Sequence, residues 1–388
     1  MEARDQLEVS VSHSLGEVEP ADWDALGTGS YPFTRYCFLH GLEIHDCLEP
    51  FGWHPVYFLL RRAGRLLAAV PCYIKTNSYG ELVFDHAWVN AYHRAGLDYY
   101  PKLVTAIPYT PATGERFLFN HELVPGADEQ QLLRETLVQV IQKFCGDQKL
   151  SSWHILFAEK DILDGLDGRH IMQRSDVQFH WHNDNYRDFD DFLSRLSSRK
   201  RKNLRKERRS VAQQNLDIRM HTGESISADD WRRIYELYAG IYQRKYGTAT
   251  LTPGFFQHLG ENMPQQVLTA LTRDQGRIVA ASLFFRSDTH LYGRVWGCDE
   301  YFNNLHFECC YYQGIDYCIR EGLQCFDPGA QGEHKLARGF LPTLTWSGHW
   351  IAHPQFREAI EQFLQQELRY IDSYQSDLLD HSPYKRTE

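Results

Sequence analysis

The sequence predicts a mixed α/β fold, with α+β character and mixed sheets, built from two related halves. The hairpin pattern R-x-x-G-R-hydrophobic-hydrophobic-A-A occurs at residues 61–69 and again at residues 273–281. In each half the hairpin is followed by an amphipathic helix and then by a short strand. Further along each half comes a His-Trp pair, His180-Trp181 and His349-Trp350. Matching features in the same order favour a duplicated fold.

The first half is placed at residues 1–182. Its predicted strands lie at Leu7–Val11, Pro55–Leu60, Arg65–Ile74 and Trp153–Ala158. Residues 128–144 carry apolar side chains at helical spacing, and Gly146 follows where a helix would stop. Residues 75–119 are rich in Tyr, Pro and Gly, and we interpret this long segment as an insertion that helps to form a site.

The second half is placed at residues 183–388. Its predicted strands lie at Val267–Thr272, Arg277–Arg286, His290–Cys298 and Gln324–Asp327. Gly276 permits a tight turn between the first two strands, and the predicted helix 306–320 ends before Gly322. The polar loop 328–335 follows the last strand. Because ligands of α/β proteins bind beyond strand ends, we expect the chemistry there.

The composition is that of a globular protein. The 388 residues are 43% hydrophobic, enough for two domains with their own cores, and the net charge of −10 argues against a general nucleic-acid-binding surface. Nine cysteines occur without a C-x-x-C pair, so we expect reduced thiols and no metal site. No run of eighteen apolar residues occurs, and the start MEARDQLEVS is highly charged. We therefore expect a cytoplasmic protein without a signal peptide or transmembrane segment.

A dense basic segment lies between the two halves. Asp188 is the predicted N-cap of a helix that continues into residues 199–209, which hold eight cations and one anion. The cations are Arg199, Lys200, Arg201, Lys202, Arg205, Lys206, Arg208 and Arg209. We interpret them as a phosphate-binding face for tRNA, a diphosphate-linked lipid precursor or anionic head groups. The alternative is a solvated face that offsets acidic surface elsewhere.

Several segments resemble known families. The stretch SRLSSRKRKNLRKERR and the pattern W-x-x-I-Y-E-L-Y-x-x-I-Y-x-R-K-Y-G at residues 231–247 resemble the Fem family of aminoacyltransferases. Fem proteins have tandem GNAT-like domains (of the acyl-CoA N-acyltransferase type) and add amino acids from aminoacyl-tRNA to peptidoglycan precursors. The chain is more closely similar to a bacterial family labelled "peptidoglycan biosynthesis/recognition" or "predicted N-acyltransferase". The shared segments are Ser78–Glu81, Phe84-Asp85, Tyr99–Leu103, Pro108–Pro111, Arg199–Arg205, His306–Glu308, Gly329–Lys335 and Arg338–Phe340.

The resemblance implies an N-acyltransferase without a tightly bound cofactor. It implies transfer of an acyl or aminoacyl group from aminoacyl-tRNA or acyl-CoA to an amine of an amino acid, peptide or peptidoglycan precursor. The Gly-rich turn with which GNAT enzymes grip the coenzyme A pyrophosphate is replaced here by residues 303–307, Asn-Asn-Leu-His-Phe, which argues against coenzyme A. A Fem motif close to F-K-x-x-F-G is matched only loosely at 337–340, so the role of its lysine falls to Arg338 or Lys335.

The loop after the last strand holds the candidate catalytic residues. Acyl transfer to an amine needs a proton acceptor, and positive charge or N–H donors for the oxyanion. The loop residues that could supply these groups are Glu333, His334, Lys335 and Arg338, and the alternative is a solvated polar loop. Glu308 near the start of a helix would act as a base if it were desolvated, and the alternative is an ordinary helix-start acid.

Candidate substrate-binding residues lie in two places. In the insertion, aromatic rings and carboxylates suit an amino-acid or muropeptide acceptor, because rings stack and attract an ammonium. These residues are Tyr79, Glu81, Asp85, Lys102 and Tyr109, and the alternative is a self-packed loop. In the second half the candidates are Trp296, Asp299 and His306. A non-catalytic protein that recognises muropeptide or RNA and retains the GNAT fold is the alternative from a different functional class.

Overall fold

The computed structural model describes residues 7–27, 29–166, 168–244, 247–330 and 332–385. Two compact units are present. Unit 1 contains the residues up to Asp176 together with Leu344–Ser373, and unit 2 contains Val177–Thr343 together with the residues from Tyr374 onward. The predicted boundary at 182/183 follows the sequence repeat, whereas the contacts join residues 344–373 to the first unit.

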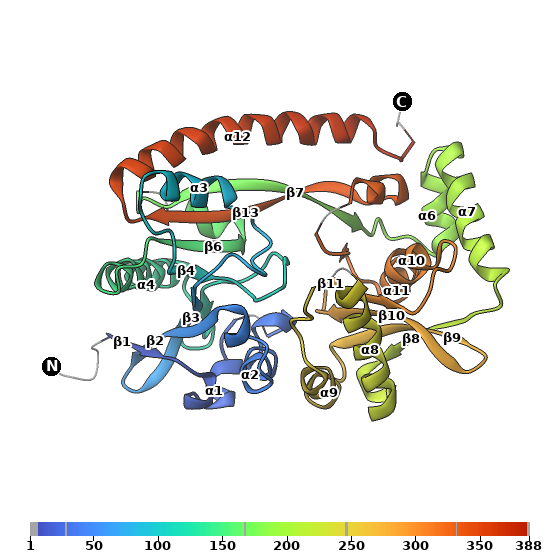
Figure 1. Cartoon of the computed structure of the whole chain (residues 1–388), viewed down its shortest axis with the longest axis horizontal. Coiled ribbons are helices and arrows are strands. Elements are labelled where there is room, and N and C mark those ends of the chain that lie inside the picture. Colours follow the sequence, from blue (N-terminus) through green and yellow to red (C-terminus); the bar gives the residue numbers. More distant parts are fainter. Residues whose placement is uncertain (1–6, 28, 167, 245–246, 331, 386–388) are drawn as a thin grey trace. The chain divides into compact units, whose positions relative to one another are not determined.

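Unit 1 is built on a mixed sheet (Figure 1). In hydrogen-bonded order its strands are β1 (Leu7–Ser12), β2 (Trp53–Arg62), β3 (Arg65–Lys75), β4 (Lys102–Thr105), β6 (Ser152–Ala158) and β13 (Leu341–Ile351). The pair β4–β6 is parallel, the other neighbours are antiparallel, and β5 (Leu118–Phe119) adds to β3. The helices are α1 (Pro20–Asp24), α2 (Tyr36–Ile44), α3 (His86–Arg94), α4 (Ala127–Asp147) and α5 (Lys160–Asp164).

Unit 2 has its own mixed sheet. Its strands follow the order β8 (Asp217–Thr222), β9 (Val267–Asp274), β10 (Arg277–Arg286), β11 (His290–Cys298), β12 (Cys325–Asp327) and β7 (Met172–His182). The pair β11–β12 is parallel and the other neighbours are antiparallel. Its helices are α6 (Phe189–Arg195), α7 (Ser198–Ala212), α8 (Ala228–Arg244), α9 (Pro253–Asn262), α10 (Leu305–Phe307) and α11 (Gln313–Glu321), and α12 (Pro354–Asp380) begins in unit 1 and ends in unit 2.

The two sheets share one topology, which confirms the predicted duplicated α/β fold. Apart from the short β5, the described residues form six strands in each sheet, in the same order and with the same pattern of parallel and antiparallel neighbours. The last strand of each sequence half completes the sheet of the other unit. Trp181 in β7 pairs with Phe326 in unit 2, and Trp350 in β13 pairs with Trp153 in unit 1. The matching His-Trp pairs of the sequence therefore mark equivalent, exchanged strands.

The two matching hairpins turn in the same way. Ala63 and Gly64 connect β2 to β3 with φ of 51° and 80°, and Gln275 and Gly276 connect β9 to β10 with φ of 48° and 85°. Positive φ at both central residues is the signature of the two-residue turn that suits twisted antiparallel strands. The shared R-x-x-G-R pattern predicted this turn because glycine adopts positive φ without steric penalty.

The segment 75–119, predicted as an insertion, is only partly a loop. Residues Lys102–Thr105 form β4, which pairs with β3 on one side and with β6 on the other. All four of its residues are buried. The additional structure in this segment is therefore mainly the chain before β4, which includes α3.

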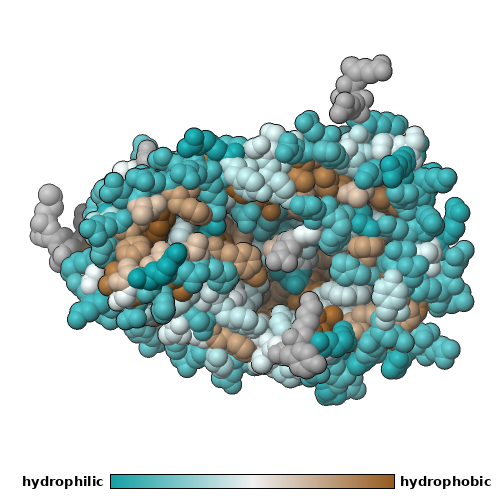
Figure 2. Space-filling model, turned by 45° about the horizontal axis from the view of Figure 1, so that its top comes forward, coloured by the Kyte–Doolittle hydropathy of each residue, from teal (hydrophilic) through white to brown (hydrophobic). Residues whose placement is uncertain are grey.

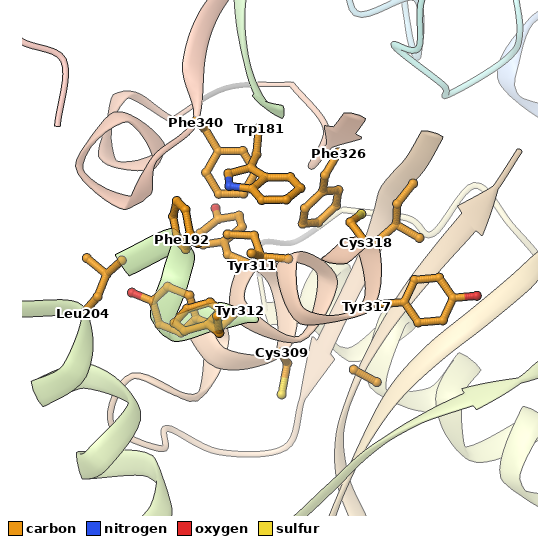
Figure 3. Packing of buried hydrophobic residues seen from close by; sticks show 14 of the residues in the cluster. Trp181, Phe192, Leu204, Cys309, Tyr311, Tyr312, Tyr317, Cys318, Phe326 and Phe340 are labelled. Atoms are coloured by element: carbon orange, nitrogen blue, oxygen red, sulfur yellow. The ribbon is translucent and has the colours of Figure 1, made fainter. Parts of the chain in front are cut away.

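The core of unit 2 gathers aromatic side chains around the helix that contains α10 and α11 (Figure 3). Trp181 from β7 lies 5.8 Å from Phe192 of α6, measured between ring centroids. Phe340 lies 5.5 Å from Phe326 and 5.4 Å from Tyr311. Aromatic pairs of this kind add about 0.5–1.5 kcal/mol each beyond the burial of their surface. They hold the helix rigidly against the sheet.

The visible surface is mainly hydrophilic, with hydrophobic patches scattered across it (Figure 2). Among the described residues, no helix combines the length and the apolar character needed to cross a membrane. The longest helix, α12, shows why, because charged and polar residues recur along its 27 positions.

Candidate functional site

A cavity of about 530 Å³ lies within unit 2, a size in the range of small-ligand sites. Its described lining residues come from β10, β11, the following helix and the loop after β12. They are Ser282, Leu283, Phe284, Gly293, Arg294, Val295, Trp296, His306, Cys310, Tyr311, Pro328, Ala330, Gly332, His334 and Lys335. Leu283 pairs with Val295 but Phe284 pairs with Gly293, so Arg294 is the extra residue of a β-bulge. Bulges bend a strand and re-aim side chains, which is what the cavity requires here.

A π-helical turn, Glu308–Tyr312, separates α10 from α11 and directs neighbouring side chains to different places. Cys310 and Tyr311 line the cavity, whereas Glu308 and Tyr312 bind side chains of α7. Such turns are rare and occur frequently at functional sites. Burial raises the pKa of Cys310 to about 12, so this thiol stays protonated and is a poor nucleophile.

A buried ion pair lies behind the cavity wall. Arg294 donates from Nη2 to Asp327 Oδ2 at 3.0 Å, and the Gly329 backbone N–H donates to Asp327 Oδ1 at 2.8 Å. His180 Nε2 lies 3.8 Å from the same Oδ1. Burial acts to raise the pKa of Asp327, but Arg294 and His180 outweigh it and the pKa is lowered. Asp327 therefore remains ionised. It anchors the start of loop 328–335, which contains candidate catalytic residues.

Lys335 is the most perturbed cation of the cavity. Its side chain is buried, and Nζ donates to the carbonyl oxygens of Gly329 at 2.6 Å and Ala330 at 3.4 Å. Burial lowers its pKa from 10.5 to about 8. A neutral lysine amine has two N–H groups, which match these two carbonyls, and one lone pair that is left to accept a proton.

A tyrosine–histidine pair forms another part of the wall. Tyr311 Oη and His334 Nε2 lie 2.9 Å apart. Burial and the nearby positive charges of Arg338 and Lys335 lower the pKa of His334, so the ring is neutral at pH 7. Gly332 has a φ of 107°, and a Cβ atom there would lie 2.5 Å from the His334 ring. Glycine is favoured at this position because a φ of 107° is strained for any residue with a Cβ atom.

The aromatic rim of the cavity includes two further predicted residues. His306 lies edge-on to Trp296 at 5.4 Å and to Tyr311 at 5.5 Å between ring centroids. Burial lowers the pKa of His306 to about 4, so this ring too is neutral. The cavity thus brings together four of the predicted site residues, His334, Lys335, Trp296 and His306.

The other ionisable residues predicted for this site have partners elsewhere in unit 2. Glu308 accepts from Arg208 at 2.9 Å and from Gln313 at 2.8 Å. Glu333 is exposed and accepts from Tyr374 at 2.5 Å. Asp299 is bound by Arg233 and lies 3.6 Å from Arg277. Each acid thus has its own hydrogen-bond donor or cation, and none lines the cavity.

Arg338 is a structural link between the loop and α7. It donates to Glu207 at 2.8 Å and to the backbone carbonyl of His334 at 2.8 Å. Its guanidinium also lies 3.4 Å from the centre of the Phe307 ring. Arg338 therefore positions the backbone next to Lys335 rather than lining the cavity.

The basic helix α7 divides its charges between two faces. Glu207 and Arg208 face the protein and bind Arg338, Tyr312 and Glu308. The exposed cations are Arg199, Lys202, Arg205, Lys206 and Arg209, with Lys200 and Arg201 partly exposed. The exposed ones share one side of the helix because they recur at intervals of three or four residues. Arg205 pairs with Asp190 at 2.8 Å.

The predicted substrate residues of the first half lie in unit 1 and form a buried charge cluster. Lys102 is fully buried and donates to Glu81 at 2.7 Å and to Asp85 at 2.5 Å. Tyr99 donates to Asp85 at 2.6 Å and lies 3.1 Å from His154 Nε2. Burial raises the pKa of Glu81, against the opposing effect of Lys102. For Asp85, burial is outweighed by Lys102 and Tyr99, and its pKa is lowered.

Two other predicted residues of unit 1 lie at the edge of this cluster. The Tyr79 carbonyl accepts from buried Lys75 at 3.1 Å and from Trp53 at 3.1 Å, while its ring is largely exposed. Tyr109 donates from Oη to the Cys47 carbonyl at 2.7 Å. Burial lowers the pKa of Lys75 to about 7.

Sequence reasoning missed several residues of the unit 2 cavity. Arg294 lies in the predicted strand His290–Cys298, and Cys310 and Tyr311 lie in the predicted helix 306–320, but none of the three was predicted as a site residue. A signal for Arg294 was available, because a lone arginine flanked by Gly293 and Val295 interrupts an otherwise apolar strand. Gln331 of the loop motif and residues 245–246 of the Fem-like pattern lie outside the described residues.

The fold and cavity define a mixed α/β protein of tandem GNAT-like domains, as predicted. Among solved structures, FemX aligns with 91% of this chain and 100% of its own at 10% identity and a TM-score of 0.52. A tandem GNAT protein from the clavulanic acid biosynthesis pathway aligns with 90% of this chain and 99% of its own, at 9% identity and a TM-score of 0.46. No curated protein matched.

The sequence itself identifies the family. A sequence model of the FemAB-like family, described as peptidoglycan biosynthesis/recognition, matches residues 14–386. The chain belongs to this family.

Proposed function

We propose that the chain is an N-acyltransferase that uses the cavity of unit 2 to move an acyl group from an activated donor to an amine. The observation that carries this proposal is Lys335, a buried amine in the cavity wall whose pKa is lowered to about 8. A proton acceptor works best when its pKa lies near the working pH. Two other titratable lining residues are less suited, because burial lowers the pKa of His306 to about 4 and raises that of Cys310 to about 12.

The proposed reaction is a direct displacement. The acceptor amine nitrogen attacks the acyl carbonyl carbon, a C–N bond forms, and the bond from that carbon to the leaving atom breaks. Neutral Lys335 accepts the proton that the amine loses and returns it to the leaving group, which departs with the bonding electron pair. The products are an amide and the protonated leaving group, so atoms and charge balance.

Tyr311 and His334 would serve the carbonyl oxygen in this scheme. If neutral His334 donates from Nε2 across the 2.9 Å contact, the Tyr311 hydroxyl proton is free for the substrate. A hydroxyl donor positioned at the carbonyl oxygen stabilises the developing oxyanion.

The acceptor that fits the family description is an amine of an amino acid, a peptide or a peptidoglycan precursor. The predicted donors, aminoacyl-tRNA and acyl-CoA, both carry phosphates that suit the exposed cations of α7. The buried cluster of Glu81, Asp85 and Lys102 has its charges satisfied internally for the most part. It therefore supports unit 1 as a scaffold more than as an acceptor site.

The pH dependence of transfer tests the proposal. Because Lys335 must be neutral to accept a proton, the rate is expected to rise with pH and level off above about 8. Hydroxylamine is a suitable acceptor because it is already neutral over this range, so the acceptor itself adds no pH dependence. Hydroxamate formation from acyl thioesters of N-acetylcysteamine measures the rate. A rate that falls between pH 7 and 9 would contradict the assignment of Lys335 as the proton acceptor. Failure to form hydroxamate with any donor would favour the alternative of a non-catalytic recognition protein.

The exposed face of α7 is expected to bind a phosphate-bearing partner. Replacing Lys202, Lys206 and Arg209 by Glu should weaken binding of unfractionated tRNA and flatten its salt dependence. Three lost phosphate contacts would lower the slope of log K against log salt by about 2. The matched control makes the same charge change in unit 1, at Lys143, Lys149 and Arg369. Equal losses in both triple variants would show that net charge alone, rather than α7, governs binding.

A further inference from the structure

The charge of the cavity wall restricts which acyl group enters it. Among the described residues that line the cavity, none is Asp or Glu. The charged lining residues are Arg294 and Lys335, and Arg294 is neutralised by Asp327 at 3.0 Å. The two lining histidines are neutral because burial lowers their pKa values. The net charge that a ligand meets is therefore zero or positive, depending on the protonation of Lys335.

The carboxylates of Asp327, Glu308 and Glu333 are held in other contacts. Both oxygens of Asp327 accept hydrogen bonds, one from Arg294 and one from the Gly329 backbone. Glu308 binds Arg208, and Glu333 is exposed and binds Tyr374. A positively charged ligand group in the cavity would thus have no anion to pair with among the described lining residues.

The aromatic rings of the cavity wall do not compensate for the lack of an anionic partner. A cation over the face of Trp296 or Tyr311 would gain about 0.5–2 kcal/mol. Removing an ammonium from water costs several kcal/mol in real proteins, and protonated Lys335 would repel it as well. The remaining wall is mixed: Leu283 and Phe284 from β10 and Val295 from β11 are apolar, and Ser282 and Tyr311 add hydroxyl groups but no negative charge. These opposing energies therefore disfavour an ammonium in the cavity and favour an uncharged group.

We infer that the acyl group handled in this cavity is uncharged and carries no free ammonium, so that an acyl donor without an α-ammonium is preferred to an aminoacyl donor. This inference rests on the proposed function, because it treats the unit 2 cavity as the acyl site. Of the two donor classes that the resemblance implies, it disfavours aminoacyl-tRNA.

Two thioesters of N-acetylcysteamine test the inference directly. The isobutyryl and alanyl thioesters have the same shape, but the second carries an ammonium where the first has a methyl group. At pH 6.5 the α-amino group is mainly protonated. Isothermal titration of the full chain is expected to show isobutyryl binding at least ten-fold more tightly than alanyl. Ala330→Trp fills the cavity and is expected to abolish isobutyryl binding, which places the ligand.

A variant with a carboxylate in the wall should reverse the preference. Val295→Asp supplies a counter-ion and is expected to bind alanyl more tightly than isobutyryl, whereas the isosteric Val295→Asn is expected to keep the wild-type order. The wild-type comparison stands on its own if the Asp variant does not fold. Equal or tighter binding of alanyl by the wild type overturns this inference and leaves the proposed function standing. Failure of both thioesters to bind overturns both.

Discussion

Replacing Lys335 by methionine is expected to lower the rate of acyl transfer by about 10²–10⁴-fold, the usual contribution of a positioned acid or base. Methionine has a similar length and flexibility but no proton acceptor. The variant is also expected to lose the rise in rate toward pH 8, because that rise reflects deprotonation of this amine. Substrate affinity should change much less, so kcat is expected to fall while KM stays nearly constant.

Stability provides the control for this variant. Burial lowers the pKa of Lys335 from 10.5 to about 8 in the folded state. At pH values below about 8, where the amine is charged in both states, this shift destabilises the folded state by about 3 kcal/mol. Between these two pH values the unfolded chain holds a proton that the folded chain lacks, so wild-type stability rises with pH across this window. The methionine variant should lack the rise and should fold at least as stably at pH 7.

The matched substitution is Lys385→Met, which removes an exposed lysine of the same unit. It is expected to leave rate, pH profile and stability unchanged. Rates measured by hydroxamate formation and unfolding followed in urea separate the two effects. Full activity in Lys335→Met with a retained pH profile would remove Lys335 from the chemistry.

Replacing Lys102 by methionine is expected to destabilise the protein by about 3–5 kcal/mol at pH 7. The reason is that Lys102 is fully buried and is bound by both Glu81 and Asp85. Removing the ammonium leaves two carboxyl groups buried without a counter-ion. The measurement is the free energy of unfolding in urea.

The contribution of Asp85 to the pH dependence of stability should change sign with this substitution. In the wild type the pKa of Asp85 is lowered, so its contribution to stability is present above its unfolded pKa and is lost as pH falls. In Lys102→Met both carboxyl pKa values should be raised, so stability should improve as pH falls toward 5. The variant Lys102→Met with Glu81→Gln and Asp85→Asn should recover much of the loss, since no buried charge remains. An unchanged stability in Lys102→Met alone would show that the cluster is solvated.

The fold was predictable because its signals are local and repeated. The positive-φ turn at Gly64 recurs at Gly276, and a period-2 or period-3.6 pattern marks most of the long elements. The family-like motif around Lys335 also identified the loop that lines the cavity. What the sequence did not reveal is the exchange of β7 and β13, because the pairing of a strand depends on contacts distant in the chain.

The detailed site was harder to predict, because the sequence indicates which residue types lie near it but not where their side chains point. Glu308 has the burial expected of a working base, but a π-helical turn aims it at Arg208. Arg294 reaches Asp327 only because a bulge shifts the register of β11. Sequence spacing gives the residue types near a site, whereas a one-residue irregularity decides which of them line it.

The exchanged strands have a consequence for synthesis on the ribosome. The first sheet lacks its sixth strand until residues 341–351 have emerged, although its other five are made by residue 158. During that interval the edge of β6 remains open to strands of other nascent chains, a recognised route to aggregation. We therefore expect a gene fragment that ends at residue 182 to yield insoluble product, and co-expression of the remainder to rescue it.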